Sequence, residues 1–241
     1  MTVTLTVVLL LGLAVAVGSV VQSAVGFGLA VVAAPFVVLA EPDLMPGALL
    51  VCGMVLPLGE LLTGERDIDR RMLTGALSTR LLFTPAGALL VAWAGTREIA
   101  LIVGVMVLLV VGVSLTRWSV RATMPNALAA GAVSGISGTA AAIGGPFLAM
   151  VLQHERPARI RSTLAAFFVV GSLTGLLALA IAGELTRDQI LAGLLWVPFL
   201  ALGAWLGRPV RRAVGPARMR TAVLAFCAIA SLVVIARALL Q

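Results

Sequence analysis

Two charged residues lie inside runs of apolar sequence. Arg80 stands in the middle of the apolar block Met72–Trp93, and Glu60 stands near the end of the preceding block, Leu44–Thr63. A charge at the depth of a bilayer is costly, so such a residue usually faces the protein interior and has a function. Arg80 can bind an anion, and Glu60 is a candidate proton or counter-ion site. The alternatives are an ion pair between the two residues, or an arginine that extends to the membrane interface.

Two further segments gather Gly, Ser and Thr within otherwise apolar sequence. They are Gln22-Ser23-Ala24-Val25-Gly26-Phe27-Gly28 and Ser134-Gly135-Ile136-Ser137-Gly138-Thr139. Gly permits irregular backbone, and hydroxyl groups can replace missing hydrogen-bond partners. We therefore expect a helix break in each segment, with a new helix beginning near Gly28 and near Ala142.

The first N–H groups of a helix lack intrahelical partners and attract anions. Two such helix starts that face each other near the bilayer centre would share one ligand. The alternative for these small residues is close packing between membrane helices. The predicted ligand-binding residues are Gln22, Ser23, Gly26, Gly28, Arg80, Ser134, Gly135, Ser137, Gly138 and Thr139, with Glu60 as the coupling candidate.

The surrounding elements are predicted to be membrane helices. The 241 residues are 61% hydrophobic and 11% charged, whereas soluble domains are about 45–50% apolar and about 25% charged. The apolar start of the chain has no basic region before it and no polar cleavage zone, so we expect it to stay in the membrane. An all-α, polytopic bundle is predicted. Its apolar blocks are Val3–Ala40, Leu44–Thr63, Met72–Trp93, Ile99–Thr116, Asn126–Leu152, Ser162–Ala182, Ile190–Leu206 and Thr221–Ile235.

The basic residues predict how these blocks cross the membrane. All 17 are arginines in a chain of net charge +7, and nearly all lie in short connectors, which favours membrane topology over nucleic-acid binding. If every block after the first crosses once, the arginines divide almost evenly between the two sides. If Asn126–Leu152 enters and returns on one side, the arginine-rich connectors share that side and leave Arg97, Arg187 and Arg237 opposite. We therefore predict a broken hairpin at Asn126–Leu152, with the arginine-rich side cytoplasmic.

The chain also contains a predicted internal repeat. When Pro35-Phe36 is aligned with Pro146-Phe147, Ser23 falls on Ser134, and each copy is followed by three more apolar blocks. With the broken hairpin, the two copies run in opposite orientation across the membrane. Inverted repeats with broken helices are a recurring plan of secondary transporters. The predicted division is a first repeat at 1–116, a cytoplasmic linker at 117–125 and a second repeat at 126–241.

In these segments the chain resembles the TauE/SafE family of membrane permeases, described as sulfite or organosulfonate exporters. The resemblance covers the whole chain and rests on its length, its two halves and a Gly-rich element that precedes a Pro in each half. The second copy departs from the first, with Ser-Gly-Thr where the first has Gly-Phe-Gly. The resemblance implies secondary export of small sulfur-containing anions across the bacterial inner membrane, coupled to an ion or substrate gradient.

Two other kinds of protein compete with a secondary transporter. A passive anion channel would use the same residues but would need a continuous water path. A membrane enzyme should show paired titratable groups at depth, and a scaffold would not need polar breaks. The sequence has no metal-ligand cluster, nucleophile with a base or phosphate-binding loop, so no cofactor and no enzyme activity are expected. The expected partners are a small anion and the lipid bilayer, not nucleic acid; assembly into a homo-oligomer is left open.

Overall fold

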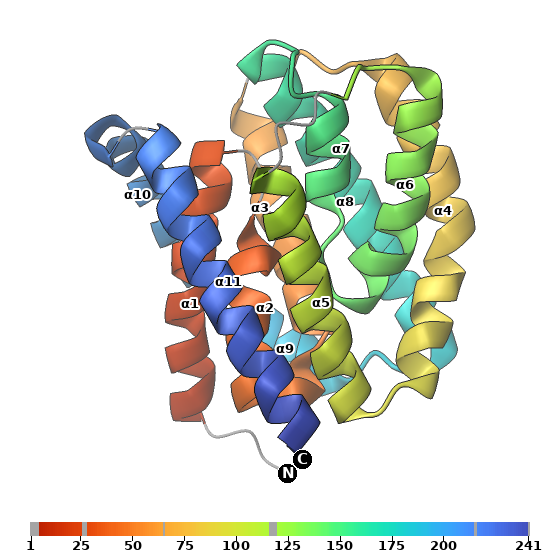
Figure 1. The fold of residues 1–241 in the computed structure, drawn as a ribbon, viewed down its shortest axis with the longest axis vertical. Coiled ribbons are helices and arrows are strands. Elements are labelled where there is room, and N and C mark those ends of the chain that lie inside the picture. The colour runs from red at the N-terminus through yellow and green to blue at the C-terminus, as the bar shows by residue number, and fades with distance from the viewer. Residues whose placement is uncertain (1–4, 26–27, 65, 116–119, 215, 241) are drawn as a thin grey trace.

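The computed structural model describes residues 5–25, 28–64, 66–115, 120–214 and 216–240, and these residues form helices and loops without any strand (Figure 1). Six helical stretches are long and apolar enough to cross a membrane, which confirms the predicted class. The elements in chain order are α1 (Leu5–Val25), α2 (Leu29–Ala40), the short 3-10 helix η1 (Pro42–Leu44), α3 (Gly47–Thr63), α4 (Arg70–Trp93), α5 (Thr96–Leu115), α6 (Met124–Ala140), α7 (Gly145–Val151), α8 (Pro157–Ala182), α9 (Arg187–Leu195), α10 (Val197–Val214) and α11 (Pro216–Leu240).

Two helical hairpins enter the bundle from opposite ends. In Figure 1, α1 rises from the lower end and α2 turns back toward it, whereas α6 descends from the upper end and α7 returns to it. The block Asn126–Leu152 thus enters and returns on one side, as the arginine distribution predicts. The remaining helices run between the two ends.

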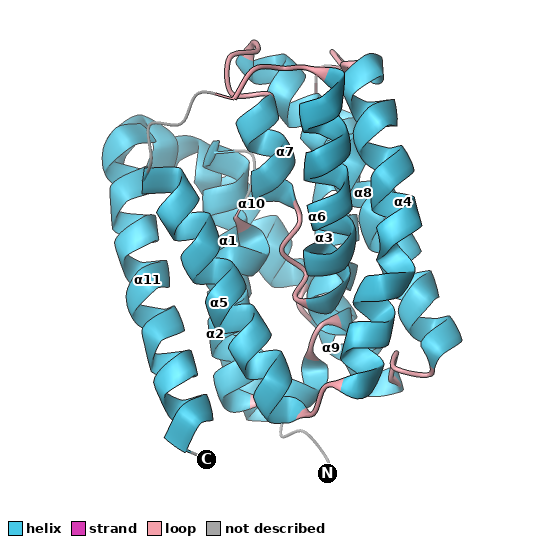
Figure 2. Cartoon of the chain, turned by 45° about the vertical axis from the view of Figure 1, so that its right-hand side comes forward, coloured by secondary structure: helices cyan, strands magenta, loops and turns pink. Residues whose placement is uncertain are grey.

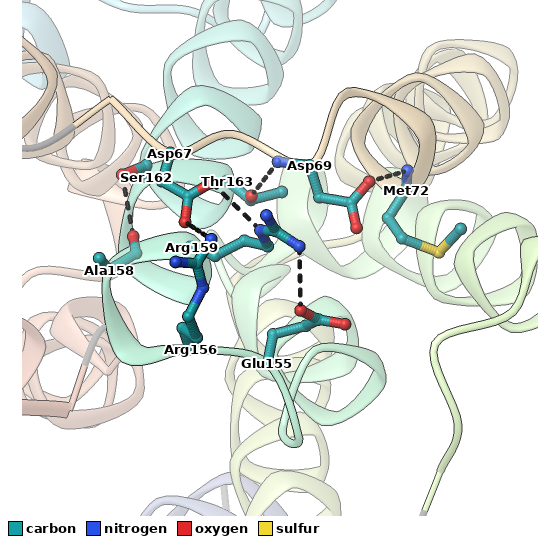
Figure 3. A network of polar contacts seen from close by, with 9 residues as sticks. All are labelled: Asp67, Asp69, Met72, Glu155, Arg156, Ala158, Arg159, Ser162 and Thr163. Atoms are coloured by element: carbon teal, nitrogen blue, oxygen red, sulfur yellow. Dashed lines mark hydrogen bonds and ion pairs between the residues drawn. The ribbon is translucent and has the colours of Figure 1, made fainter.

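The arginine-rich connectors lie together at the upper end, where the α3–α4, α5–α6, α7–α8 and α10–α11 junctions are found (Figure 1). Asp67, between α3 and α4, accepts from Arg156 at 2.9 Å and from Arg159 at 3.2 Å (Figure 3). The backbone N–H of Asp69 donates to Thr163 Oγ1 at 2.9 Å. These contacts fasten the α3–α4 connector to the first turns of α8. Because the charged groups are partly exposed, each ion pair contributes at most about 1 kcal/mol.

The small residues of α6 serve close packing rather than a helix break. Helix α6 continues without interruption to Ala140, so the prediction of a break near Gly135–Thr139 is wrong. The reason is that α6 lies directly against α4: a Cβ on Gly131 would overlap the carbonyl oxygen of Ala76, and one on Gly135 would lie 2.6 Å from the carbonyl oxygen of Arg80. Glycines therefore let the two backbones approach.

The second break lies a few residues later, at 141–144, and the helix that follows begins at Gly145 rather than near Ala142. Ala142 has φ 58, a left-handed conformation that is unusual for a residue with a side chain. The break leaves backbone carbonyls without helical partners, and two serines of α6 satisfy them. Ser134 Oγ donates to Gly144 O at 2.6 Å and Ser137 Oγ donates to Ile143 O at 2.8 Å. Figure 2 shows the loop before α7 inside the bundle.

The first break agrees with its prediction. Helix α1 ends at Val25, and α2 begins at Leu29 after Gly28, whose φ of 125 is readily adopted only by glycine. Both hairpins therefore place non-helical backbone between other helices, where it can be shielded from lipid.

The outer surface of the bundle is suited to lipid. Large apolar side chains remain exposed on several helices, among them Leu82 at 72%, Trp93 at 87% and Ile181 at 88%. An apolar surface of this extent would not be stable in water. The chain is therefore a multi-pass membrane protein.

Candidate anion-binding site

The two helix breaks meet at one small cavity. The first hairpin contributes Gln22 and the chain from Gly28 to Val31, and the second contributes Gly138 and the chain from Ala142 to Pro146. The cavity has about 20 Å³ of free volume, which is room for about one water molecule. The two breaks therefore line one cavity, although the second break lies at 141–144 and not in the predicted segment 135–139. The other lining residues are Leu49, Leu50 and Gly53 of α3, Arg80 of α4, and Phe168 and Ser172 of α8.

Arg80 brings a buried positive charge to this cavity. Its side chain is 2% exposed, so the prediction that the guanidinium faces the interior is confirmed, and extension to the membrane interface is excluded. No ion pair joins Arg80 to Glu60 or to any other carboxylate among the described residues. Within that part of the chain its Nε and Nη1 atoms also have no hydrogen-bond partner. A buried cation without a counter-charge is unfavourable unless a ligand supplies one.

Neighbouring helices fix the position of the guanidinium. Its Cζ atom lies 4.4 Å from the centre of the Phe167 ring, a cation–π contact. A Cβ on Gly171 would overlap the guanidinium, and a Cβ on Gly138 would lie 3.2 Å from Nη2. Two glycines and one aromatic ring on α6 and α8 therefore form the space that the guanidinium occupies.

The predicted ligand-binding residues separate into three groups. Gln22, Gly28, Arg80 and Gly138 line the small cavity. The second group supports the fold around it: Ser134 and Ser137 donate to carbonyls of the second break, and Gly135 packs against α4. The third group is elsewhere: Thr139 is buried with no partner for Oγ1 among the described residues, Ser23 lines a second cavity, and Gly26 lies outside the described residues.

A larger cavity of about 510 Å³ lies between α1, α3, α8 and α10. It is lined by Glu60, Ser23, Arg161 and Ser162, and it reaches Thr63 and Gly64, which are exposed. The two cavities follow each other along α3, from Gly53 to Gly64, and along α8, from Ser172 to Ala158. Glu60 therefore lies between the arginine-rich end and Arg80.

Sequence reasoning missed several residues of the site, namely Phe167, Phe168, Gly171 and Ser172. All four belong to α8, in the block Ser162–Ala182, and their composition is ordinary for a membrane helix. Only their spacing could have indicated a shared site, because Phe168 and Ser172 are four residues apart and therefore lie on the same face of the helix. Nothing in the sequence indicates that this face meets Arg80.

Helices long enough to cross a membrane, two helical hairpins with broken backbone and a buried cationic cavity together define a polytopic membrane transporter of small anions. This class agrees with a comparison to known families. The chain matches the family described as Sulfite exporter TauE/SafE over residues 10–234, and it belongs to that family. Searches of curated proteins and of solved structures found no match.

Proposed function

We propose that this chain is a secondary transporter that exports sulfite or a related small sulfur oxyanion from the bacterial cytoplasm, and that Arg80 binds the transported anion. The observation that carries the proposal is a guanidinium at 2% exposure whose Nε and Nη1 atoms have no partner among the described residues, at the cavity where both breaks meet.

Charge and geometry favour an oxyanion as the ligand of Arg80. An arginine presents several N–H donors in one plane, which match two oxygens of the same anion. Its burial strengthens this interaction, because little water competes for the donors. An anion also offsets the cost of the buried charge, so binding and release change the stability of the closed site.

The larger cavity is proposed as the route from the cytoplasm. It reaches Thr63 and Gly64 at the end of α3 and Ala158 at the start of α8. These helix ends border arginine-rich connectors, and the positive-inside rule assigns that end to the cytoplasm. Arg161 in its wall attracts anions, and Glu60 beside the route is the candidate for coupling to a proton or cation. A titratable carboxylate at this position can change its charge as the anion passes.

An inverted repeat is proposed as the basis of alternating access. The helix pairs support it: α1 packs on α10 while α6, the counterpart of α1, packs on α4. The middle helices of the two halves, α3 and α8, pack on each other, as do α5 and α11. A two-fold relation between halves produces this exchange of partners. Rocking of one half against the other would then expose the site alternately to each side.

Transport by proteoliposomes tests the role of Arg80. Vesicles loaded with radiolabelled sulfite should release it through the wild-type protein, and Arg80→Ala should lower the rate at least tenfold at equal reconstitution. Arg80→Lys should restore little, because an ammonium lacks the planar donor pair. Normal transport by Arg80→Ala would exclude Arg80 as the substrate ligand.

The same vesicles test the coupling role of Glu60 and separate a transporter from a passive channel. An imposed pH gradient should drive sulfite against its own gradient in the wild type, and Glu60→Gln should abolish this effect while downhill transport continues. Downhill flux that no ion gradient can reverse would indicate a channel.

A further inference from the structure

The first N–H group of α2 is occupied by a side chain from the other arm of its hairpin. Leu29 N donates to Gln22 Oε1 at 3.3 Å. Gln22 is 3% exposed and Leu29 is 2% exposed, and both line the small cavity together with Arg80. A neutral amide oxygen therefore lies at the helix start in the cavity that Arg80 lines, where the guanidinium Nε and Nη1 have no partner among the described residues.

This contact is a weak form of helix capping. The usual N-cap residues are Ser, Thr, Asp and Asn, whose oxygen bonds the second or third N–H of the helix. Here the N-cap is Gly28, which has no side chain to accept such a bond. The acceptor comes instead from seven residues earlier, and its distance of 3.3 Å is longer than most N–H···O bonds in proteins, which measure about 2.7–3.2 Å.

A charged oxygen would make a better partner for the same N–H. Hydrogen bonds to ionised acceptors are shorter and about twice as strong as neutral ones, and the start of a helix carries a partial positive charge. An oxyanion bound to Arg80 has further oxygens to offer an N–H group, and Leu29 lines the same cavity as Arg80. The free volume of about 20 Å³ does not admit such an anion unless a lining side chain moves.

We propose that Gln22 is a built-in competitor of the substrate: its Oε1 holds the place of one oxyanion oxygen at Leu29 N in the empty site, and the arriving anion displaces it. This inference rests on the proposed role of Arg80. It also assigns Gln22 a role in selectivity. An anion must bring enough charge and enough oxygens to bond Arg80 and replace Gln22 together. A halide, with a single centre, satisfies this requirement poorly, so multi-oxygen anions are favoured over chloride.

Equilibrium binding to the purified full chain tests the competitor role, with radiolabelled sulfite as the probe and chloride as the challenger. Gln22→Met keeps the length of the side chain but removes the acceptor oxygen, and it should bind sulfite about fivefold more tightly, the equivalent of one lost competing hydrogen bond. Chloride should also displace sulfite from this variant more readily than from the wild type. Gln22→Glu places a fixed negative charge at the helix start and should weaken sulfite binding at least fivefold.

The outcomes separate this inference from the proposed function. If Arg80→Ala binds sulfite as the wild type does, the site itself is wrongly assigned. If Arg80→Ala loses binding while Gln22→Met binds sulfite equally or more weakly than the wild type, Arg80 keeps its role and the competitor role is overturned. Thermal unfolding without ligand shows whether each variant is folded, and Gln22→Leu replaces Gln22→Met if the latter is not.

Discussion

At the scale of single residues, the site depends on what surrounds Arg80 as much as on Arg80 itself. The guanidinium has Phe167 on one side and the backbone of Gly171 next to it. Neither residue can neutralise its charge, but both restrict its position. A binding group held in one position loses little conformational entropy when its ligand arrives. The glycine at 171 is therefore as specific a requirement as the arginine.

Gly171→Ala should disable the site by displacing the guanidinium. The new Cβ would overlap Arg80 Cζ, and overpacking of this kind costs about 1–3 kcal/mol. We expect sulfite transport to fall at least tenfold, with a lower unfolding temperature in detergent. The matched control is Gly112→Ala, because a Cβ at Gly112 meets no atom within 4 Å. Equal transport by the two variants would show that the position of Arg80 is not critical.

At the scale of elements, the two hairpins together show small residues serving two different purposes, close packing and a break in the helix. In α6, Gly131 and Gly135 allow close contact with α4, and in the chain around 28 and 142 the backbone adopts left-handed conformations. Ser134 and Ser137 contribute to both, because they belong to the packed helix α6 and their hydroxyls donate to backbone carbonyls of the break. Packing and break are thus built from neighbouring turns of one segment.

Valine at Gly28 or at Gly138 should damage transport for distinct reasons. Gly28 has φ 125, where a β-branched residue is strained by about 1–3 kcal/mol. At Gly138 a Cβ would lie 3.2 Å from Arg80 Nη2 and 3.4 Å from Gly144 Cα, so the larger valine must push apart the guanidinium and the break. Proteoliposome transport should fall in both variants.

The control for this comparison is Gly112→Val, whose surroundings are open. Gly104 is unsuitable although it lies in the same plain span, because a Cβ there would lie 2.6 Å from Ile235 Cγ1. If Gly112→Val reduced transport as much as the variants at the breaks, the loss would reflect general damage to membrane helices.

At the scale of the whole molecule, the two cavities and the arginine-rich connectors together predict the end of the bundle from which an anion enters. The larger cavity is lined by the end of α3 and the start of α8, which border arginine-rich connectors, and the small cavity is lined by the two breaks. Arg161 lies in the wall of the larger cavity and Arg80 in that of the small one, so the proposed route for an anion from the arginine-rich end meets Arg161 first. The proposed function therefore requires the arginine-rich end to face the cytoplasm.

Cysteine labelling in intact cells tests this orientation. Thr63 is the last residue of α3 and Thr96 is the first residue of α5, and both are exposed. The native Cys52 and Cys227 are buried and should give little background. In Figure 1, α3 ends at the upper end of the bundle and α5 begins at the lower end. Thr96→Cys should react with a membrane-impermeant maleimide added outside, and Thr63→Cys should react only after the membrane is permeabilised. The reverse pattern would place the arginine-rich end outside.

The sequence by itself determined the class, the hairpin at Asn126–Leu152 and which residue carries the buried charge. Apolar blocks of membrane length, arginines in connectors and Arg80 within such a block are local features, and the bilayer makes each of them informative because it excludes charge from its core. The sequence also predicted that the second hairpin enters and returns at one end of the bundle. A segment that returns to its own side moves every later connector to the opposite side, and this change brings the arginine-rich connectors together.

The tertiary structure alone decided where the second break falls and what surrounds Arg80. Glycine and serine are enriched both where a helix breaks and where it packs closely on another helix. The sequence therefore could not show that residues 135–139 pack and that the break lies at 141–144. The contact of α6 with α4 shows this. Likewise, Gly171, Phe167 and the bond from Leu29 N to Gln22 Oε1 depend on contacts between helices or across a turn. Such contacts are set by how side chains of different helices interlock, and a single sequence does not record which faces meet.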